Sequence, residues 1–538
     1  MRVLIFHGYL LGGTGSNVYN ARLAEALARL GHDVHLLCQE RHPEQHPFID
    51  AAGDWDEGML RVRGLRTAGE REQRAEEPGE RADARGSCTV YRPEIGSLLP
   101  VYVADRYEGT QARTFAQCSD AEIERYVQAN VAAVRELRDA LRPDVALANH
   151  LVMGPAILAR GLGGEVGYAV KVHGSALEYT VKPEPARFLP WAREGLAAAA
   201  AVLVGSRHTA ESLWRALADA ELPSRTRLGP PGVDVVRFAP REPRAAAAGV
   251  RELAETLRAE TAPAGAPDGS AFARDPVQAA RALARLDPER DALVAFVGKL
   301  IVSKGVDLLL AAFPLVLGHV PRARLVIVGF GAYRDGLQRL LEALADGDLE
   351  GAAALARAGR SLEDPAVAQR PLRHLLAFLE GLQGERRERY LLAAAGLGER
   401  VVLTGRMDHE ELAELLPACE ALVVPSTFPE AFGMVAAEGA ACGALPLSAA
   451  HSGLAEVSEE LARAVPAPIA RLLSFPVDDG AVEAIAERLV SWLGAAEPLR
   501  AATREGLVGA VRERWSWEGV ARGVIAAARG DLDDLREP

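Results

Sequence analysis

The chain has 538 residues and a formal net charge of -13. This length exceeds what one ordinary hydrophobic core supports and predicts two or three domains, at roughly 150 residues for each. The acidic balance argues against a broad interface with nucleic acid, which requires a basic surface. Hydrophobic residues make up 49% of the chain. No apolar run is long enough to span a membrane, so at most a peripheral membrane contact is expected.

The N-terminus begins MRVLIFHGYL, where a short apolar run leads straight into a glycine-rich loop. A β-strand explains this pattern better than an export signal, so we expect a cytoplasmic protein. The five cysteines are scattered without CxxC or any metal-ligand spacing. We therefore expect reduced structural thiols and no metal site. These cysteines are Cys38, Cys88, Cys118, Cys419 and Cys442.

Strand and helix patterns alternate along the first part of the chain. The apolar run RVLIF is followed by a glycine-rich turn, a helical pattern near 16–30 and the run DVHLLC. This is the strand, helix, strand order of a doubly wound α/β domain. Further strands are expected at 145–149, 168–174 and 200–206, and further helices at 121–141 and 208–219. Residues 1–235 are predicted to form one Rossmann-like domain.

A second series of apolar runs follows a crossing segment, GPPGVDVVRFAP, at 229–240. The runs lie at 292–299, 323–329, 400–405, 420–426 and 444–448. Each is followed by a helical pattern, so residues 291–510 are predicted to form a second Rossmann-like domain after a linker and helical insertion at 236–290. Two such domains would face each other across a cleft.

Three stretches look like additions to this plan. Residues 64–87 are rich in Arg, Glu and Gly and predict a mobile surface loop. Residues 241–290 combine a helical pattern with the breaker run TAPAGAPDGS, which predicts a helical insertion with a flexible centre. Residues 332–399 predict several helices that cover the cleft, form a homo-oligomer contact or decorate the surface; the pattern does not choose among these.

The chain ends in an amphipathic helical pattern within 511–538 that carries Trp515 and Trp517. Such a helix either returns to the first domain as a strut or packs on its own domain.

The loop after the first strand contains Gly12, Gly13 and Gly15, and a helix N-terminus follows it. This geometry suits an anion, although a tight turn without a ligand is an equal explanation. The dinucleotide pattern GxGxxG would need a third glycine at position 18, which is Val. A nicotinamide oxidoreductase is therefore disfavoured.

The segment STFPEAFGMVAAEGAACGALPL places Glu430 and Glu438 eight residues apart around a Phe-Gly turn. Glu438 is expected about two turns into a helix that begins near Phe432 to Met434. Free N–H groups at such a helix start bind phosphate or sugar oxygens, and the two carboxylates accept hydrogen bonds from hydroxyl groups. In the structural alternative, Glu430 is an acid at the start of the helix and Glu438 is a solvated helix residue. The small apolar residues around Glu438 disfavour this alternative for Glu438, because a buried acid needs a partner.

Only four of the 61 basic residues are lysines, namely Lys171, Lys182, Lys299 and Lys304. In a chain that uses Arg so widely, a remaining Lys indicates a position that needs a compact ammonium group. Chance survival on a solvated face is the alternative for any single Lys.

The segment around Glu430 and Glu438 resembles the EX7E motif of retaining glycosyltransferase family 4. Other motifs resemble that family in its order along the chain: GGTGSNVY, KVHGSALEY, VGSR, PPGVDVVRF, FVGKLIVSKG and the closing WSWEGVA. The resemblance implies an α/β GT-B architecture, with two Rossmann-like domains and helical insertions. It also implies a glycosyltransferase that uses a nucleotide diphosphate sugar.

The resemblance further implies roles for the donor-side residues. Glu430 would hold hydroxyl groups of the donor sugar and Glu438 the ribose, while Lys299 and Lys304 would neutralise the diphosphate without a metal or cofactor. The glycine loop with Gly12 and Gly13 and the segment Phe432, Gly433 and Met434 complete the expected donor site. The family usually has Arg where this chain has Lys299.

His173 would lie beside the transferring sugar carbon, as the family's His does; a lone His after an apolar strand is otherwise more often a core group. Lys171 alternates with His173, so both are expected on the same side of one strand. His150 and Glu178 are candidates for the acceptor side from their loop positions.

The leading hypothesis is a retaining hexosyltransferase with a UDP-sugar donor, favoured over a GDP-sugar, and an unidentified acceptor. A disaccharide phosphorylase or synthase on the same fold is the first alternative, and a binding protein with an inactive site is the second. The acceptor class, including a lipid-linked one, stays open.

Overall fold

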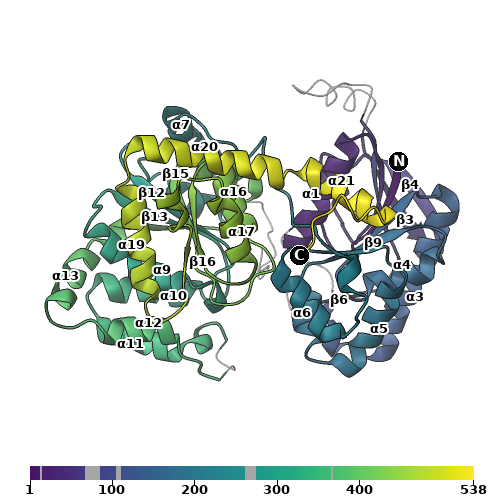
Figure 1. The fold of residues 1–538 in the computed structure, drawn as a ribbon, viewed down its shortest axis with the longest axis horizontal. Helices are drawn as coiled ribbons and strands as arrows, with labels where there is room; N and C mark the ends of the chain where they lie inside the picture. Colours follow the sequence, from purple (N-terminus) through teal and green to yellow (C-terminus); the bar gives the residue numbers. More distant parts are fainter. Residues whose placement is uncertain (13–14, 67–84, 104–110, 261–273, 365–367) are drawn as a thin grey trace. The chain divides into compact units, whose positions relative to one another are not determined.

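The computed structural model describes all residues except 13–14, 67–84, 104–110, 261–273 and 365–367. Two compact units make up the described chain (Figure 1). The first contains Met1–Gly232 together with Trp515–Pro538, and the second contains Val233–Arg514.

The first unit is built on a nine-stranded sheet, counted over the described residues, with the order β11-β10-β9-β8-β1-β2-β5-β3-β4. All neighbouring strands are parallel except β3 and β4. The strands are β1 (Arg2–Phe6), β2 (Asp33–Leu37), β3 (Ala51–Asp56), β4 (Met59–Gly64), β5 (Cys88–Arg92), β8 (Val145–Asn149), β9 (Tyr168–Val172), β10 (Ala201–Val204) and β11 (Thr226–Leu228). A separate parallel pair joins β6 (Leu98–Val101) and β7 (Gln111–Thr114).

Helices cover both faces of this sheet, so its central strands are buried on both sides. Leu4 and Phe6 of β1 join one hydrophobic core, while Val3 and Ile5 join the other. The first core contains residues of α3 (Asp120–Leu141), α4 (Gly154–Leu162), α5 (Pro185–Ala197) and α6 (Arg207–Leu217). The second core contains residues of α1 (Gly15–Arg29) and α21 (Trp517–Arg529). Burial on both faces explains why these strands appear as continuous apolar runs.

The second unit contains a six-stranded parallel sheet with the order β14-β13-β12-β15-β16-β17. Numbered within the unit, this is the 3-2-1-4-5-6 order of a Rossmann sheet, and the order reverses between β12 and β15. The strands are β12 (Ala292–Val297), β13 (Ala323–Val328), β14 (Val401–Gly405), β15 (Cys419–Val424), β16 (Leu445–Ala449) and β17 (Ser474–Phe475).

The helices that follow these strands are α9 (Val306–Leu317), α15 (His409–Leu415), α16 (Met434–Ala441), α17 (Ser452–Ala462), α18 (Ala467–Ala470), α19 (Ala481–Leu493) and α20 (Glu497–Arg514). Every strand that the sequence predicted is present in the two sheets. Strands β3 to β7, β11 and β17 were not predicted. In the case of β4, the strand is mostly exposed and carries arginines instead of an apolar run.

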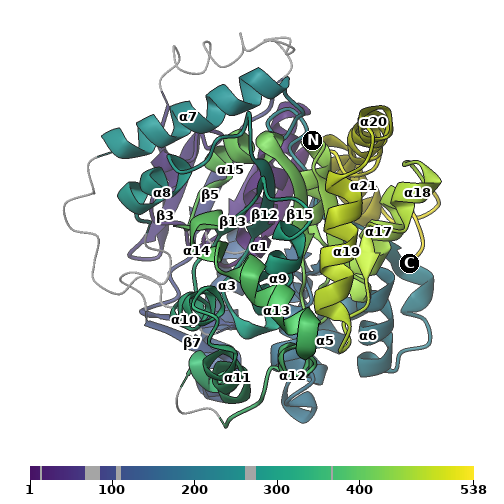
Figure 2. The ribbon, with the colours of Figure 1, turned by 90° about the vertical axis from the view of Figure 1, so that its left-hand side faces the viewer.

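The predicted insertion at 332–399 forms α10 (Arg334–Ala345), α11 (Leu349–Ala358), α12 (Arg373–Glu380), α13 (Gly384–Ala394) and α14 (Leu397–Arg400). α10, α12 and α13 pack against α9, and Figure 2 shows α13 beside α9. The Tyr390 hydroxyl donates a 3.0 Å hydrogen bond to the Ala311 carbonyl of α9. The inserted helices therefore extend the helical layer of their own unit.

The insertion at 241–290 contains α7 (Pro243–Ala259) and α8 (Pro276–Leu283), and its predicted flexible centre lies outside the described residues. Most of the predicted loop at 64–87 also lies outside them. All five cysteines are buried and free. No described helix is long and apolar enough to cross a membrane.

The C-terminal helix α21 belongs to the first unit, whereas α20 before it belongs to the second. Trp517 is 3% exposed and packs edge-on against Tyr19 at 5.5 Å between ring centroids. A Cβ on Gly232 would lie 2.5 Å from the Trp517 ring, so this approach requires glycine. The helix completes the core on one face of the first sheet (Figure 1).

Replacing Trp517 with Ala should destabilise the first unit by about 3–5 kcal/mol, because it removes a buried aromatic side chain and leaves a cavity. Hydrogen exchange of the β8 and β9 amides in the full chain measures this locally. The matched variant Trp191→Ala, at a half-buried site over which Arg160 stacks, should cost clearly less. Equal protection in the Trp517→Ala chain would show that α21 does not stabilise this sheet.

Candidate functional site

The carboxyl ends of β12 and β15 lie at the reversal of strand order in the second sheet, where ligands bind in open α/β sheets. The loop after β12 contains Lys299 and Lys304, and the loop after β15 contains Glu430. Gly305 has φ +66°, and a Cβ there would lie 2.1 Å from the Pro425 carbonyl oxygen. Only glycine allows these two loops to approach so closely.

Glu430 is held by groups from both loops. The Lys304 ammonium pairs with Glu430 Oε1, and the Ser426 hydroxyl donates a 2.6 Å hydrogen bond to the same oxygen. The Thr427 N–H donates to the Ser303 carbonyl at 2.8 Å, which ties the loops together. The structure thus brings the predicted pair Lys304 and Glu430 into direct contact.

The N-terminus of α17 also holds the Glu430 loop in place. The Glu430 N–H donates to Ser452 Oγ at 2.9 Å, and the Gly453 N–H donates to the Glu430 carbonyl at 2.9 Å. His451 Nε2 donates to the Ser426 carbonyl at 2.8 Å, so its Nδ1 accepts from the Ser452 hydroxyl at 3.0 Å. None of these supporting residues was identified from the sequence.

Glu438 is 5% exposed and lies in α16. Because α16 begins at Met434, Glu438 lies just beyond the first turn, not about two turns in as predicted. It is partnered: His409 Nε2, from the start of α15, lies 3.0 Å from Glu438 Oε1. Gly433 is the N-cap of α16, and Phe432 precedes it.

In the first sheet the order reverses at β1 and β8, and three histidines follow strand ends there. His7 follows β1, His150 follows β8 as its next residue, and His173 follows β9. The His150 and His173 ring centroids are 5.0 Å apart, and those of His150 and His7 are 5.9 Å apart. The predicted residues His150 and His173 therefore lie together.

Lys171 and His173 lie against the same ring, as their alternation predicted. The Lys171 ammonium is 5.4 Å from the centroid of Tyr19, and the His173 ring is 5.0 Å from it. Lys171 is 2% exposed and donates to the Gly229 carbonyl. Burial lowers the pKa of Lys171 to about 7. Burial, with smaller contributions from His150 and Lys171, also holds the pKa of His173 well below its ordinary value.

His150 is buried in an aromatic cluster, with the Tyr102 ring centroid at 4.3 Å. Neither ring nitrogen has a hydrogen-bond partner among the described residues. Burial lowers the pKa of His150 well below its ordinary value, so the ring is neutral at pH 7. The carboxylate of Glu178 accepts hydrogen bonds from Lys182 at 2.7 and 2.9 Å and from Ser212 at 2.7 Å.

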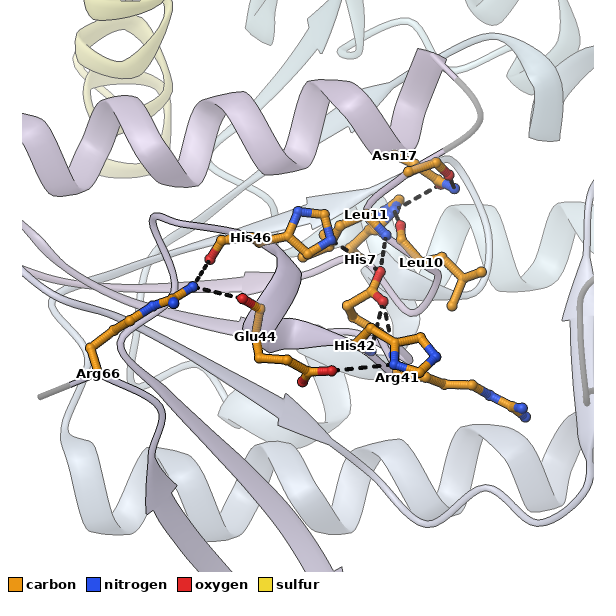
Figure 3. A network of polar contacts seen from close by, with 11 residues as sticks. His7, Leu10, Leu11, Asn17, Arg41, His42, Glu44, His46 and Arg66 are labelled. Atoms are coloured by element: carbon orange, nitrogen blue, oxygen red, sulfur yellow. Dashed lines mark hydrogen bonds and ion pairs between the residues drawn. The ribbon is translucent and has the colours of Figure 1, made fainter. Parts of the chain in front are cut away.

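The glycine-rich loop after β1 is held by His7 and by a buried carboxylate. His7 lies close to Leu10 and Asn17 in Figure 3, which also shows Leu11 beside them. The Leu11 N–H donates to Glu40 Oε2 at 3.0 Å. Gly12 follows in the described loop, whereas Gly13 lies outside the described residues.

Glu40 remains ionised although it is largely buried. Burial favours its neutral form, but hydrogen bonds from His46 and from the N–H groups of His42 and Leu11 outweigh that and lower the pKa of Glu40 to about 2. The N–H groups of Leu11, Arg41 and His42, together with His46, hold this carboxylate, and the Leu11 contact anchors the loop that precedes Gly12.

No group of three or more His, Cys, Asp or Glu residues with metal-ligand geometry is found in the part of the chain that the structure describes.

Comparison with known families matches both units. The family described as "Glycosyl transferase 4-like domain" matches residues 14–222, and "Glycosyl transferases group 1" matches residues 284–348 and 374–505. Together these matches cover more than half of the chain.

Two curated relatives are D-inositol 3-phosphate glycosyltransferases. The protein from Segniliparus rotundus is 30% identical over 255 residues, which are 47% of this chain and 43% of that protein. The one from Salinispora tropica is 29% identical over 286 residues, 53% of this chain and 44% of that protein. The matched region thus spans less than half the length of either relative.

Among solved structures, the sucrose-phosphate synthase from Thermosynechococcus elongatus superposes with a TM-score of 0.53 at 18% identity and covers 99% of both chains. Anabaena HepE in complex with UDP and glucose has a TM-score of 0.51 at 14% identity, over 99% of this chain and 100% of that chain. At these identities the likeness establishes the fold alone.

The two Rossmann-like units and the family matches over both of them define a glycosyltransferase of the GT-B class. Within that class, the chain belongs to glycosyltransferase family 4.

Replacing Glu40 with Gln should destabilise the folded chain by on the order of 2 kcal/mol at pH 7. A carboxyl with a lowered folded pKa stabilises the fold above its unfolded pKa of 4.5, and this contribution is lost as pH falls toward 2. The difference from wild type in urea unfolding should therefore shrink between pH 5 and pH 2.5.

The matched variant Glu44→Gln, at a half-exposed carboxylate of the same segment, should change stability little at any pH. A cost for Glu40→Gln that is independent of pH would attribute its effect to packing instead of charge.

Proposed function

We propose that this chain transfers a hexose-type sugar from a nucleotide diphosphate sugar to an acceptor, with retention of the anomeric configuration and without a metal. A UDP-sugar is the favoured donor, ahead of a GDP-sugar. The observation that carries this proposal is the joint placement of Lys304, Glu430 and Ser426 at the sheet reversal of the second unit. Family membership restricts the reaction class.

Each donor-side residue has chemistry suited to one part of such a donor. Carboxylates accept hydrogen bonds from hydroxyl groups, so Glu430 is assigned to the sugar and the buried Glu438 to the ribose. Lys299 and Lys304 are assigned to the diphosphate. The N–H groups near Phe432 and Gly433, at the start of α16, supply further donors for sugar or phosphate oxygens.

The pairing of Lys304 with Glu430 does not conflict with a role at the diphosphate. An ammonium group has three N–H donors, and Glu430 occupies one of them. Lys304 can therefore bridge the sugar-binding carboxylate and a phosphate oxygen. A cation in this position would stabilise the departing nucleotide, which is the step that otherwise requires a metal ion.

The donor preference is supported by what similar structures contain. Anabaena HepE is described in complex with UDP-glucose, and an Escherichia coli trehalose-6-phosphate protein is described as bound to UDP-2-fluoro glucose. The curated relatives make D-inositol 3-phosphate the first acceptor to assay.

The side that handles the acceptor and the transferring carbon is assigned to four residues of the first unit: His173, His150, Lys171 and Glu178. Gly12 and Gly13 remain candidate donor contacts.

A thermal-shift panel with UDP, GDP, ADP and their sugar conjugates should raise the melting temperature most with the uridine compounds, because a ligand that binds only the folded state stabilises it. Glu438→Gln should weaken this binding by about 10-fold, since it removes a charged acceptor for the ribose hydroxyls.

Glu420 provides the matched control. It lies near the start of β15, whereas Glu430 follows the end of that strand, and it pairs with Arg500 and Arg504. Glu420→Gln should keep the nucleotide response. If no nucleotide shifts the wild-type chain, the phosphorylase or inactive-site alternatives replace this proposal.

Transfer should proceed unchanged in excess EDTA, with rates within about twofold, because the two lysines take the place of a cation at the diphosphate. NMR analysis of the glycoside formed from an α-linked donor should show the α anomer. Loss of transfer in EDTA that magnesium restores would contradict the lysine assignment, and a β product would contradict retention.

A further inference from the structure

A continuous series of side-chain hydrogen bonds, buried at its centre and partly buried at both ends, runs through the first unit from His173 to the glycine-rich loop. His173 Nε2 lies 2.8 Å from Asn149 Oδ1, and Asn149 Nδ2 lies 2.7 Å from Asn20 Oδ1. Asn20 Nδ2 lies 3.0 Å from His7 Nδ1. His7 Nε2 lies 3.1 Å from Asn17 Oδ1, and Asn17 Nδ2 lies 2.7 Å from the Gly12 carbonyl oxygen.

The orientation of each amide in this series is determined by a backbone carbonyl, which can only accept a hydrogen bond. Asn149 Nδ2 also faces the Phe6 carbonyl at 3.2 Å, and Asn20 Nδ2 also faces the Ser16 carbonyl at 2.8 Å. Asn17 Nδ2 faces the Gly12 carbonyl. In each amide the end beside the carbonyl must be the NH2 group, so none can be reversed without placing two acceptors together.

The amide orientations in turn determine both histidine tautomers. His7 Nδ1 receives a donor from Asn20, so the proton of His7 lies on Nε2, where it donates to Leu10 and Asn17. His173 Nε2 faces the acceptor Oδ1 of Asn149, so it carries a proton. The Nδ1 atom of His173 then holds the lone pair, suited to accept a hydrogen bond from a hydroxyl group.

The members of this series have little access to water that could replace a lost partner. Asn17, Asn20, Asn149 and His7 are each at most 2% exposed. Burial lowers the pKa of His7 to about 4, so the ring is neutral at pH 7. The whole series therefore has one direction, from His173 toward Gly12.

We propose that Asn149 and Asn20 are positioning residues that hold His173 as the Nε2–H tautomer and link it to the carbonyl of Gly12. The role of His173 at the transferring sugar rests on the proposed function, whereas the tautomers rest on the hydrogen bonds alone. Neither asparagine was named as a site residue from the sequence. Their contribution is to present Nδ1 of His173 as an acceptor in a single orientation.

Nitrogen-15 NMR of the full chain with labelled histidines tests the tautomers without any substrate. Substitutions His7→Gln and His173→Gln assign the signals. The wild-type spectrum should show both rings as the Nε2–H form at pH 7.5. An Nδ1–H form at either ring would overturn the inference, and this outcome does not depend on any variant folding.

Two substitutions should have different effects on the two rings. Asn20→Asp replaces the donor that faces His7 Nδ1 with a carboxylate acceptor, while Nε2 still faces the Leu10 carbonyl, so His7 should gain a second proton on Nδ1. His173 should keep its proton on Nε2, because the introduced carboxylate still accepts from Asn149. Asn149→Ala should release His173 into exchange between tautomers and leave His7 unchanged. The same response at both rings would overturn the separate roles.

The matched control is Asn130→Ala. Asn130 is also buried in the first unit, but it donates to the Tyr126 carbonyl and lies outside the series. Asn149→Ala should lower kcat by about 10- to 100-fold with the donor KM within about twofold, whereas Asn130→Ala should keep kcat even if it lowers stability. Equal losses of kcat in the two variants would show that Asn149 has only a structural role.

Absence of sugar transfer in the wild type would overturn the proposed function and leave the tautomer result intact.

Discussion

The reversal of strand order in the parallel part of each sheet is the constraint on which the candidate sites depend. Parallel strands end at the same edge of a sheet, and at the reversal the following helices lie on opposite faces. The loops after β12 and β15 meet there, close enough that Gly305 cannot carry a Cβ beside the Pro425 carbonyl. The ends of β1 and β8 meet in the same way and bring His7 close to His150.

A second requirement, that buried polar groups find partners, determines which residues accompany the candidate functional ones. Glu430 is stabilised by Ser426 and by Lys304. Glu438 is paired with His409 on a different helix. In the first unit a series of asparagines performs the corresponding task for His173. The ring nitrogens of His150 and the hydroxyl of Tyr19, which packs against His173, are exceptions among the described residues.

The sequence was sufficient to predict the architecture because buried parallel strands are apolar on both faces and stand out as continuous runs. It failed for β4, whose exposed arginines carry no such pattern. It also placed Lys304 and Glu430 in one site, since both follow strands on motifs that resemble one family. The partners Ser426, His451 and Ser452 were missed because single serines and histidines near strand ends have no distinctive spacing.

The sequence by itself determined the α/β class, the alternation that forms two sheets, and the chemistry available at the strand ends. Only the tertiary structure decided that α21 completes the first unit, that Glu178 pairs with Lys182 and Ser212, and that His409 reaches Glu438. The physical reason is the difference in sequence separation between the interactions involved. Periodicity and propensity act over a few residues along the chain, whereas the partner of a buried polar group is chosen by packing among segments far apart in sequence.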